Sequence, residues 1–128
     1  MTAEVKKPDH RGLNHVFKAF GYSMQGLQAA IVNEEAFRLE LIAFIIMFPL
    51  GLWLGEGAVE KVLLTSCLFL VLIVELINSA VEAVVDRIGV EHHVLAGRAK
   101  DIGSAAVFMS LVVTGLTWGL ILYEKFVH

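Results

Sequence analysis

The chain has 128 residues, of which 57% are hydrophobic and only 18% charged, and its mean hydropathy is +0.72. This composition excludes a soluble globular domain, because so small a chain would expose too much apolar surface to water. The net charge of −3 says little alone, since the positions of Lys and Arg matter more in a membrane protein. The single cysteine, Cys67, excludes an internal disulfide.

The N-terminal part predicts a lead-in and then an amphipathic helix. Residues 1–12 are polar and charged and predict a mobile lead-in, with no secretory signal in the charged first forty residues. Residues 13–32 predict a helix whose apolar side chains form one narrow stripe: Leu13, Val16, Phe17, Phe20, Met24, Leu27 and Ile31. A soluble core could cover such a stripe, but so apolar a chain offers none, so we expect the helix to lie in the membrane interface.

Three apolar blocks follow, at residues 41–54, 62–85 and 105–122, and few or no charges interrupt them. They predict transmembrane helices at about residues 38–55, 61–86 and 103–125. With no internal repeat and no long linker, we expect residues 1–128 to form a single domain of the all-α membrane class.

The positions of Lys and Arg predict the orientation of these spans. Basic residues precede the first span (Lys6, Lys7, Arg11, Lys18, Arg38) and lie in the second loop, residues 88–101, or at its edge (Arg87, Arg98, Lys100). The first loop and the tail each contain one, Lys61 and Lys125. The positive-inside rule therefore places the N-terminus and the second loop in the cytoplasm.

The second span carries a polar stripe made of Glu75, Asn78, Glu82 and Asp86, within a sector of about 80°. An ionisable side chain inside a membrane costs on the order of 3 kcal/mol, and such residues commonly mark a functional site. Hydrogen bonding to neighbouring helices is the structural alternative. The outer carboxylates are placed to bind a divalent cation on phosphate, and the deeper Glu75 to accept a proton.

The second loop adds a charged cluster that can meet phosphate oxygens: Glu91, His92, His93, Arg98, Lys100 and Asp101. The adjacent histidines would point about 100° apart on a helix, so they make a poor pair of metal ligands. The chain contains no GxxxxGK[ST], GxGxxG or CxxC motif. A nucleotide would therefore need another kind of binding site.

Four segments together carry a family resemblance: KAFGYSMQGLQAA (18–30), NEEAFRLE (33–40), VELINSAVEAVVDRIG (74–89) and EHHVLAGRAKDIGSAA (91–106). From about Leu13 to the third span the chain resembles the prokaryotic diacylglycerol kinase family. The resemblance implies a homotrimer in the bacterial cytoplasmic (inner) membrane, with three spans and one interfacial helix per chain. It also implies active sites between subunits that phosphorylate diacylglycerol to phosphatidic acid with ATP and Mg²⁺, by direct in-line transfer, and no nucleic-acid partner.

The resemblance also implies roles for single residues. Glu75 matches the general base for the lipid hydroxyl, Asn78 its neighbour, and Lys100 a cation that offsets phosphoryl charge. Glu34 and Glu82 match the carboxylates that hold Mg²⁺. The nucleotide positions are Tyr22, Glu34, Glu82, Asp86, His93, Lys100 and Asp101, and the lipid positions are Ala30, Glu75 and Ser104. His15, Gln25 and Gln28 stand where well-known members have basic residues, which puts phosphate contacts from the interfacial helix in question.

Three alternatives remain open. The same family includes undecaprenol kinases, although the VDRIG ending of the stripe favours diacylglycerol. An ion or proton pathway along Glu75 and Glu82 is disfavoured, because the apolar stretches of the other two spans contain no ionisable partner. A trimer in which the stripe serves only assembly predicts that Glu75→Gln harms stability as much as activity.

Overall fold

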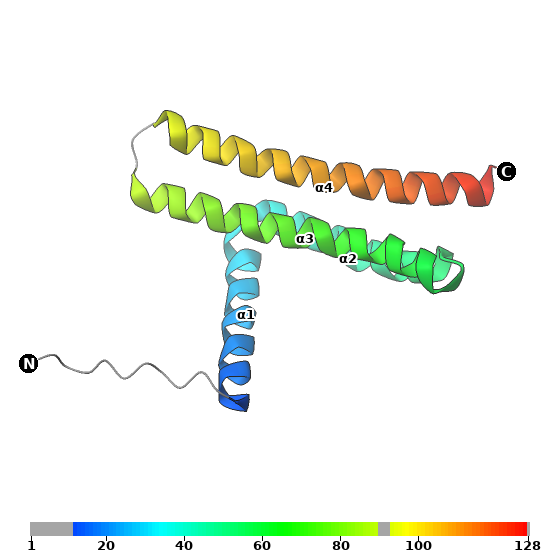
Figure 1. Cartoon of the computed structure of the whole chain (residues 1–128), viewed down its shortest axis with the longest axis horizontal. Coiled ribbons are helices and arrows are strands. Elements are labelled where there is room, and N and C mark those ends of the chain that lie inside the picture. The colour runs from blue at the N-terminus through cyan, green and yellow to red at the C-terminus, as the bar shows by residue number, and fades with distance from the viewer. Residues whose placement is uncertain (1–11, 90–92, 128) are drawn as a thin grey trace, which may run out of the picture.

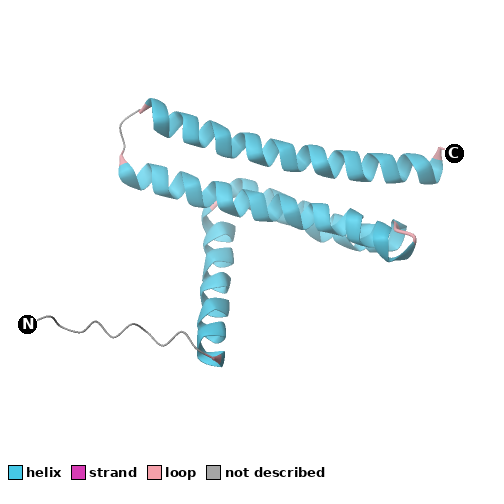
Figure 2. Cartoon of the chain, in the orientation of Figure 1, coloured by secondary structure: helices cyan, strands magenta, loops and turns pink. Residues whose placement is uncertain are grey.

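The computed structural model describes residues 12–89 and 93–127, and this part of the chain is all α-helical (Figures 1 and 2). Its helices are α1 (Leu13–Asn33), α2 (Glu35–Leu54), α3 (Gly57–Ile88) and α4 (Val94–Phe126). The predicted all-α fold class is confirmed. The lead-in at residues 1–12, apart from Gly12, lies outside the described residues, as do Glu91 and His92 of the charged cluster.

Three of the helices run alongside one another, and α1 lies crosswise to them (Figure 1). Helices α2, α3 and α4 are each long and apolar enough to cross a membrane, with mean hydropathies of 1.9, 2.2 and 2.0 over their most apolar windows. Most of their large apolar side chains face outward, where lipid rather than water can cover them. The chain therefore has the architecture of a multi-pass membrane protein.

A single residue, Glu34, separates α1 from α2. Its backbone is extended (φ −116°, ψ 108°), which redirects the chain from the crosswise α1 into α2. Arg38 secures the junction, because its Nη1 donates hydrogen bonds to the carbonyl oxygens of Ile31 (2.9 Å) and Val32 (3.0 Å). These carbonyls belong to the last turn of α1 and have no partner within their own helix. The end of α1 is thereby held against the beginning of α2.

Helix α3 lies between α2 and α4 and forms the core with both. The half of α3 that lies away from α1 packs through Leu64 and Leu68 against Trp118 of α4. The Nε1 of Trp118 donates a hydrogen bond to the carbonyl oxygen of Leu64 (3.0 Å). Nearer α1, the core consists of Ala30, Phe37 and Leu72. This second cluster joins α1, α2 and α3 at one level of the bundle.

The predicted loop at residues 88–101 is wrong for most of its length. Helix α4 begins at Val94 rather than at residue 103, so Arg98, Lys100 and Asp101 are helical. The imidazole Nδ1 of His93 accepts a hydrogen bond from the backbone N–H of Leu95 (3.0 Å) and so caps this early start. Hydropathy marks where an apolar segment ends, whereas a helix continues as long as its backbone is paired and packed.

The other predicted boundaries differ from the observed ones by no more than about one helical turn. Helix α1 lies beside α3 near Leu76 to Ala83, before α3 ends. The last turns of α3 and the first turns of α4 therefore extend beyond α1, and we call this part the projecting end (Figure 1).

Candidate active site

The polar stripe of α3 runs from a buried end to an exposed end. Glu75 and Asn78 are 4% and 8% exposed, Glu82 is half-buried, and Asp86 lies at the surface. The side-chain amide Nδ2 of Asn78 donates a hydrogen bond to Glu82 Oε1 (3.4 Å). Asp86 forms an ion pair with Lys100 of α4, with 2.6 Å between Oδ1 and Nζ. The stripe therefore connects the bundle interior with the projecting end of α3 and α4.

Glu75 is the centre of this arrangement. Its side chain lies within hydrogen-bonding reach of those of Asn78 and Glu40, and its charge is coupled to those of Glu82 and Glu34. Glu34 stands between α1 and α2, Glu40 on α2, and the others on α3. The fold thus gathers four carboxyl groups that the sequence distributes over nearly fifty residues.

Glu40 was not among the predicted site residues. In the sequence it is the last charge before the first apolar block, where it looks like a boundary marker. In the structure its carboxyl group interacts directly with that of Glu75. The signal that could have found it is its place at the end of NEEAFRLE, one of the segments that carry the family resemblance.

Unpaired polar atoms mark the same region. In the part of the chain that the structure describes, the buried side-chain atoms without a hydrogen-bond partner are Glu40 Oε2, Asn78 Oδ1 and Ser79 Oγ. Buried polar atoms are almost always paired, because an unpaired one costs about 1–3 kcal/mol. Their concentration on α2 and α3 around Glu75 is typical of a site that receives a polar ligand.

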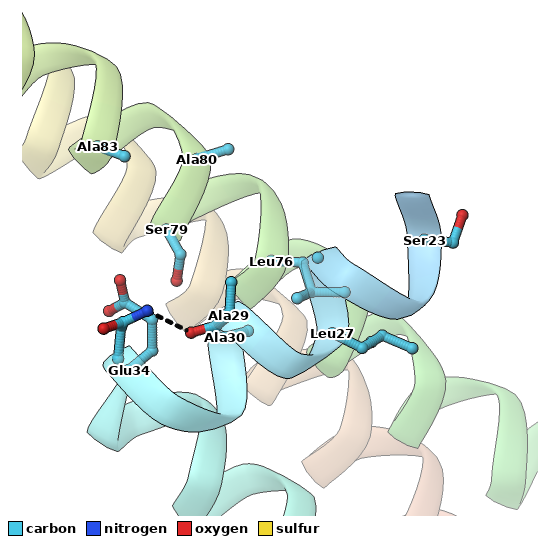
Figure 3. A pocket seen from close by; sticks show the side chains of 11 residues that line it. Ser23, Leu27, Ala29, Ala30, Glu34, Leu76, Ser79, Ala80 and Ala83 are labelled. Atoms are coloured by element: carbon cyan, nitrogen blue, oxygen red, sulfur yellow. Dashed lines mark hydrogen bonds between the residues drawn. The ribbon is translucent and has the colours of Figure 1, made fainter. Parts of the chain in front are cut away.

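A pocket of about 720 Å³ opens between α1 and α3 beside this cluster (Figure 3). Its walls are mostly small or apolar: Ser23, Gly26, Leu27, Ala29, Ala30, Asn33, Glu34, Leu76, Ser79, Ala80 and Ala83. Ser79 and Glu34 point into the same end of it (Figure 3). Glu34 holds the N-cap position of α2, but its side chain makes no capping hydrogen bond and is available to the pocket. The pocket can therefore take a molecule with an apolar body and one polar end.

Residues 21–122 match the prokaryotic diacylglycerol kinase family. The chain belongs to this family. It is 50% identical over 115 residues to a diacylglycerol kinase of Escherichia coli K12, which covers 90% of this chain and 94% of that protein. A diacylglycerol kinase of Haemophilus influenzae is 52% identical over 112 residues (88% and 95%), and one of Pseudomonas aeruginosa 43% identical over 111 residues (87% and 90%).

As in any kinase, the site of this family member must also accept a nucleotide, which makes the projecting end of α3 and α4 important. His93 lines a second pocket there, of about 440 Å³, with Val85, Ile88, Gly89, Leu95, Ala96 and Ala99. Lys100 and Asp86 meet on its two helices. The predicted residues Tyr22, Asp101 and Ser104 are exposed and line neither pocket.

Carboxylate side chains are among the ligands that divalent metal ions prefer in proteins. Within residues 12–89 and 93–127 there is no group of three His, Cys, Asp or Glu side chains that could hold a metal ion by themselves. Mg²⁺ commonly takes only one or two carboxylates and completes its shell with phosphate oxygens and water. Glu34 and Glu82 both lie close enough to Glu75 to interact with its charge.

Proposed function

We propose that this chain transfers the γ-phosphoryl group of ATP to the hydroxyl of diacylglycerol and so forms phosphatidic acid. The observation that carries the proposal is a buried carboxyl group, Glu75, on a membrane-spanning helix beside a largely apolar pocket. A soluble phosphoryl acceptor would not require a base at that depth. The diacylglycerol kinases that resemble this chain over nearly their full length support the acceptor.

The lipid side of the reaction uses the pocket between α1 and α3. The acyl chains lie over its apolar wall, near Ala30, and the glycerol hydroxyl reaches toward Glu75. Glu75 takes the hydroxyl proton as the oxygen attacks the γ-phosphorus, the bond from this phosphorus to the bridging oxygen breaks and ADP leaves, while Asn78 holds the carboxylate in place. The rest of the rate enhancement comes mostly from holding the reactants close together in the right orientation, because the transfer needs no covalent phosphoenzyme.

The nucleotide side extends from Glu34, at the junction of α1 and α2, to the projecting end of α3 and α4. Glu34 and Glu82 would hold Mg²⁺, which would supply positive charge to the phosphates. Lys100 adds positive charge near the same oxygens, and Asp86, Asp101, His93 and Tyr22 surround the nucleotide. The support for this division is geometric, since the stripe changes from buried to exposed toward Asp86.

The orientation and assembly complete the proposal. The clusters of Lys and Arg favour a cytoplasmic position for the N-terminus and for the connection from α3 to α4, on the side of the membrane where ATP is available. A homotrimer in the inner membrane would bring the exposed Tyr22, Asp101 and Ser104 of one subunit toward the pocket of another. In this arrangement each active site lies between subunits.

The experiment measures phosphatidic acid formed from diacylglycerol, ATP and Mg²⁺ in detergent micelles. The wild type is compared with Glu75→Gln and with Glu124→Gln, which makes the same change at an exposed position near the other end of the bundle. We expect Glu75→Gln to stay folded and to lose about 10²–10⁴-fold in rate, and Glu124→Gln to remain active. Equal rates in all three proteins would refute Glu75 as the base. Equal loss of stability and activity in Glu75→Gln would favour a purely structural stripe.

A further inference from the structure

Gly103 of α4 faces the side chain of Asn78 on α3. A methyl group built on Gly103 would overlap Asn78 Oδ1 and come within 3.3 Å of Cγ. The other glycines of α4, Gly97, Gly115 and Gly119, have no such neighbour within 4 Å. The absence of a side chain at position 103 therefore leaves room for one particular group, the amide of Asn78.

The amide of Asn78 is held between two contacts. Its Nδ2 donates to Glu82 Oε1, and its Oδ1, buried and without a hydrogen-bond partner, lies against the backbone of α4 at Gly103. If a methyl group occupied the space at 103, the atom in its way would be the far end of a side chain and not a backbone atom. The amide would turn away before the helices separated.

We propose that Gly103 is a positioning residue for phosphoryl transfer, which fixes the orientation of the Asn78 amide and through it the carboxylates of Glu75 and Glu82. The inference rests on the roles given to Asn78 and Glu82 in the proposed function. Gly103 lines neither of the two pockets assigned to the substrates, so in this proposal it acts through Asn78. Small displacements of positioning groups lower rates strongly, because catalysis depends on near-exact alignment of the reacting atoms.

The test compares Gly103→Ala with Gly97→Ala in the full-length protein. Both changes replace a glycine of α4 by a residue that favours the helix more, so neither should weaken the helix itself. Gly97→Ala should keep kcat within about twofold of wild type, since its methyl group enters open space. Gly103→Ala should lower kcat about tenfold or more, with the KM values for ATP and lipid changed much less.

A second measurement separates displacement of the amide from a general loss of structure. The chain has three asparagines, Asn14, Asn33 and Asn78, so ¹⁵N-asparagine labelling gives a simple spectrum of side-chain amides. An Asn78→Ala variant assigns its signal. Gly103→Ala should shift the Asn78 signal and leave that of Asn33 in place, and Gly97→Ala should shift neither.

An unshifted Asn78 amide in Gly103→Ala, or a kcat within twofold of wild type, would overturn the inference while leaving the proposed function intact. Full activity in Asn78→Ala would instead refute the proposed role of Asn78, and this inference with it.

Discussion

The carboxyl group of Glu40, on α2, lies against that of Glu75, on α3. Glu40 stands shortly after the junction at Glu34 that separates α1 from α2, and its Oε2 is buried without a hydrogen-bond partner. The contact links the helix next to the lipid pocket with the proposed base. Glu75 therefore has side-chain neighbours on two sides, Asn78 within α3 and Glu40 across the helix interface.

We expect Glu40→Gln to lower kcat about tenfold without unfolding the protein, because the new amide can occupy the same space but changes the hydrogen bonding of Glu75. Glu35→Gln on the same helix is the matched control, since Glu35 is exposed. Kinetics in diacylglycerol micelles measure the effect, and circular dichroism verifies the fold. Wild-type kcat in Glu40→Gln would show that Glu75 does not depend on this contact.

Lys100→Met should lower the activity of the protein but not its stability. The ion pair of Lys100 with Asp86 is exposed on both sides, 44% and 65%, and such pairs contribute about 0–1 kcal/mol. Loss of a charge that stabilises the transferring phosphoryl group should lower kcat about 10²-fold. Lys125→Met removes another ion-paired lysine of α4, the partner of Glu56 at 3.0 Å, and should leave kcat unchanged. Similar rates for the two variants would remove Lys100 from the site.

The lipid acceptor can be tested by competition between diacylglycerol and undecaprenol for limiting enzyme. We expect a higher kcat/KM for diacylglycerol than for undecaprenol, with phosphatidic acid as the main product, because the relatives that resemble this chain are named diacylglycerol kinases. Thin-layer separation of the labelled products gives both rates in one sample. Faster labelling of undecaprenol would reassign the acceptor and leave the transfer chemistry in place.

Trp118→Phe should weaken the bundle far from the site. Trp118 is 8% exposed and its Nε1 donates to the carbonyl oxygen of Leu64, so the variant loses one buried hydrogen bond and some packing, about 1–2 kcal/mol. Trp53→Phe is the control, because Trp53 is 78% exposed and should tolerate the change. Unfolding in mixed detergent measures both. A lower kcat in folded Trp118→Phe would show that the packing around Trp118 also affects the active site.

A cation-flux measurement in liposomes without ATP separates the kinase from the ion-pathway alternative. We expect no flux above that of empty liposomes, since the apolar stretches of α2 and α4 hold no ionisable residue to extend the stripe across the bilayer. Flux that disappears in Glu75→Gln would establish a pathway along α3.

The sequence by itself determined the class of protein, the number of spans and the polar stripe. Hydropathy and helical period are local properties, so residues 13–32 and the three apolar blocks could be assigned from composition and spacing. Glu75, Asn78 and Glu82 were recognisable for the same reason, because a polar side chain within an apolar segment stands out without knowledge of its neighbours.

Tertiary structure alone decided what surrounds that stripe. The contact of Glu40 with Glu75, the place of Gly103 opposite Asn78 and the early start of α4 at Val94 all depend on how the helices rotate and pack against each other. The linear sequence pattern does not predict these rotations, because the same apolar helix can present any of its faces to its neighbours in lipid. The physical reason is that the bounds of a span depend on how each local segment partitions between lipid and water. Site geometry depends instead on side-chain packing between segments that are far apart in the sequence.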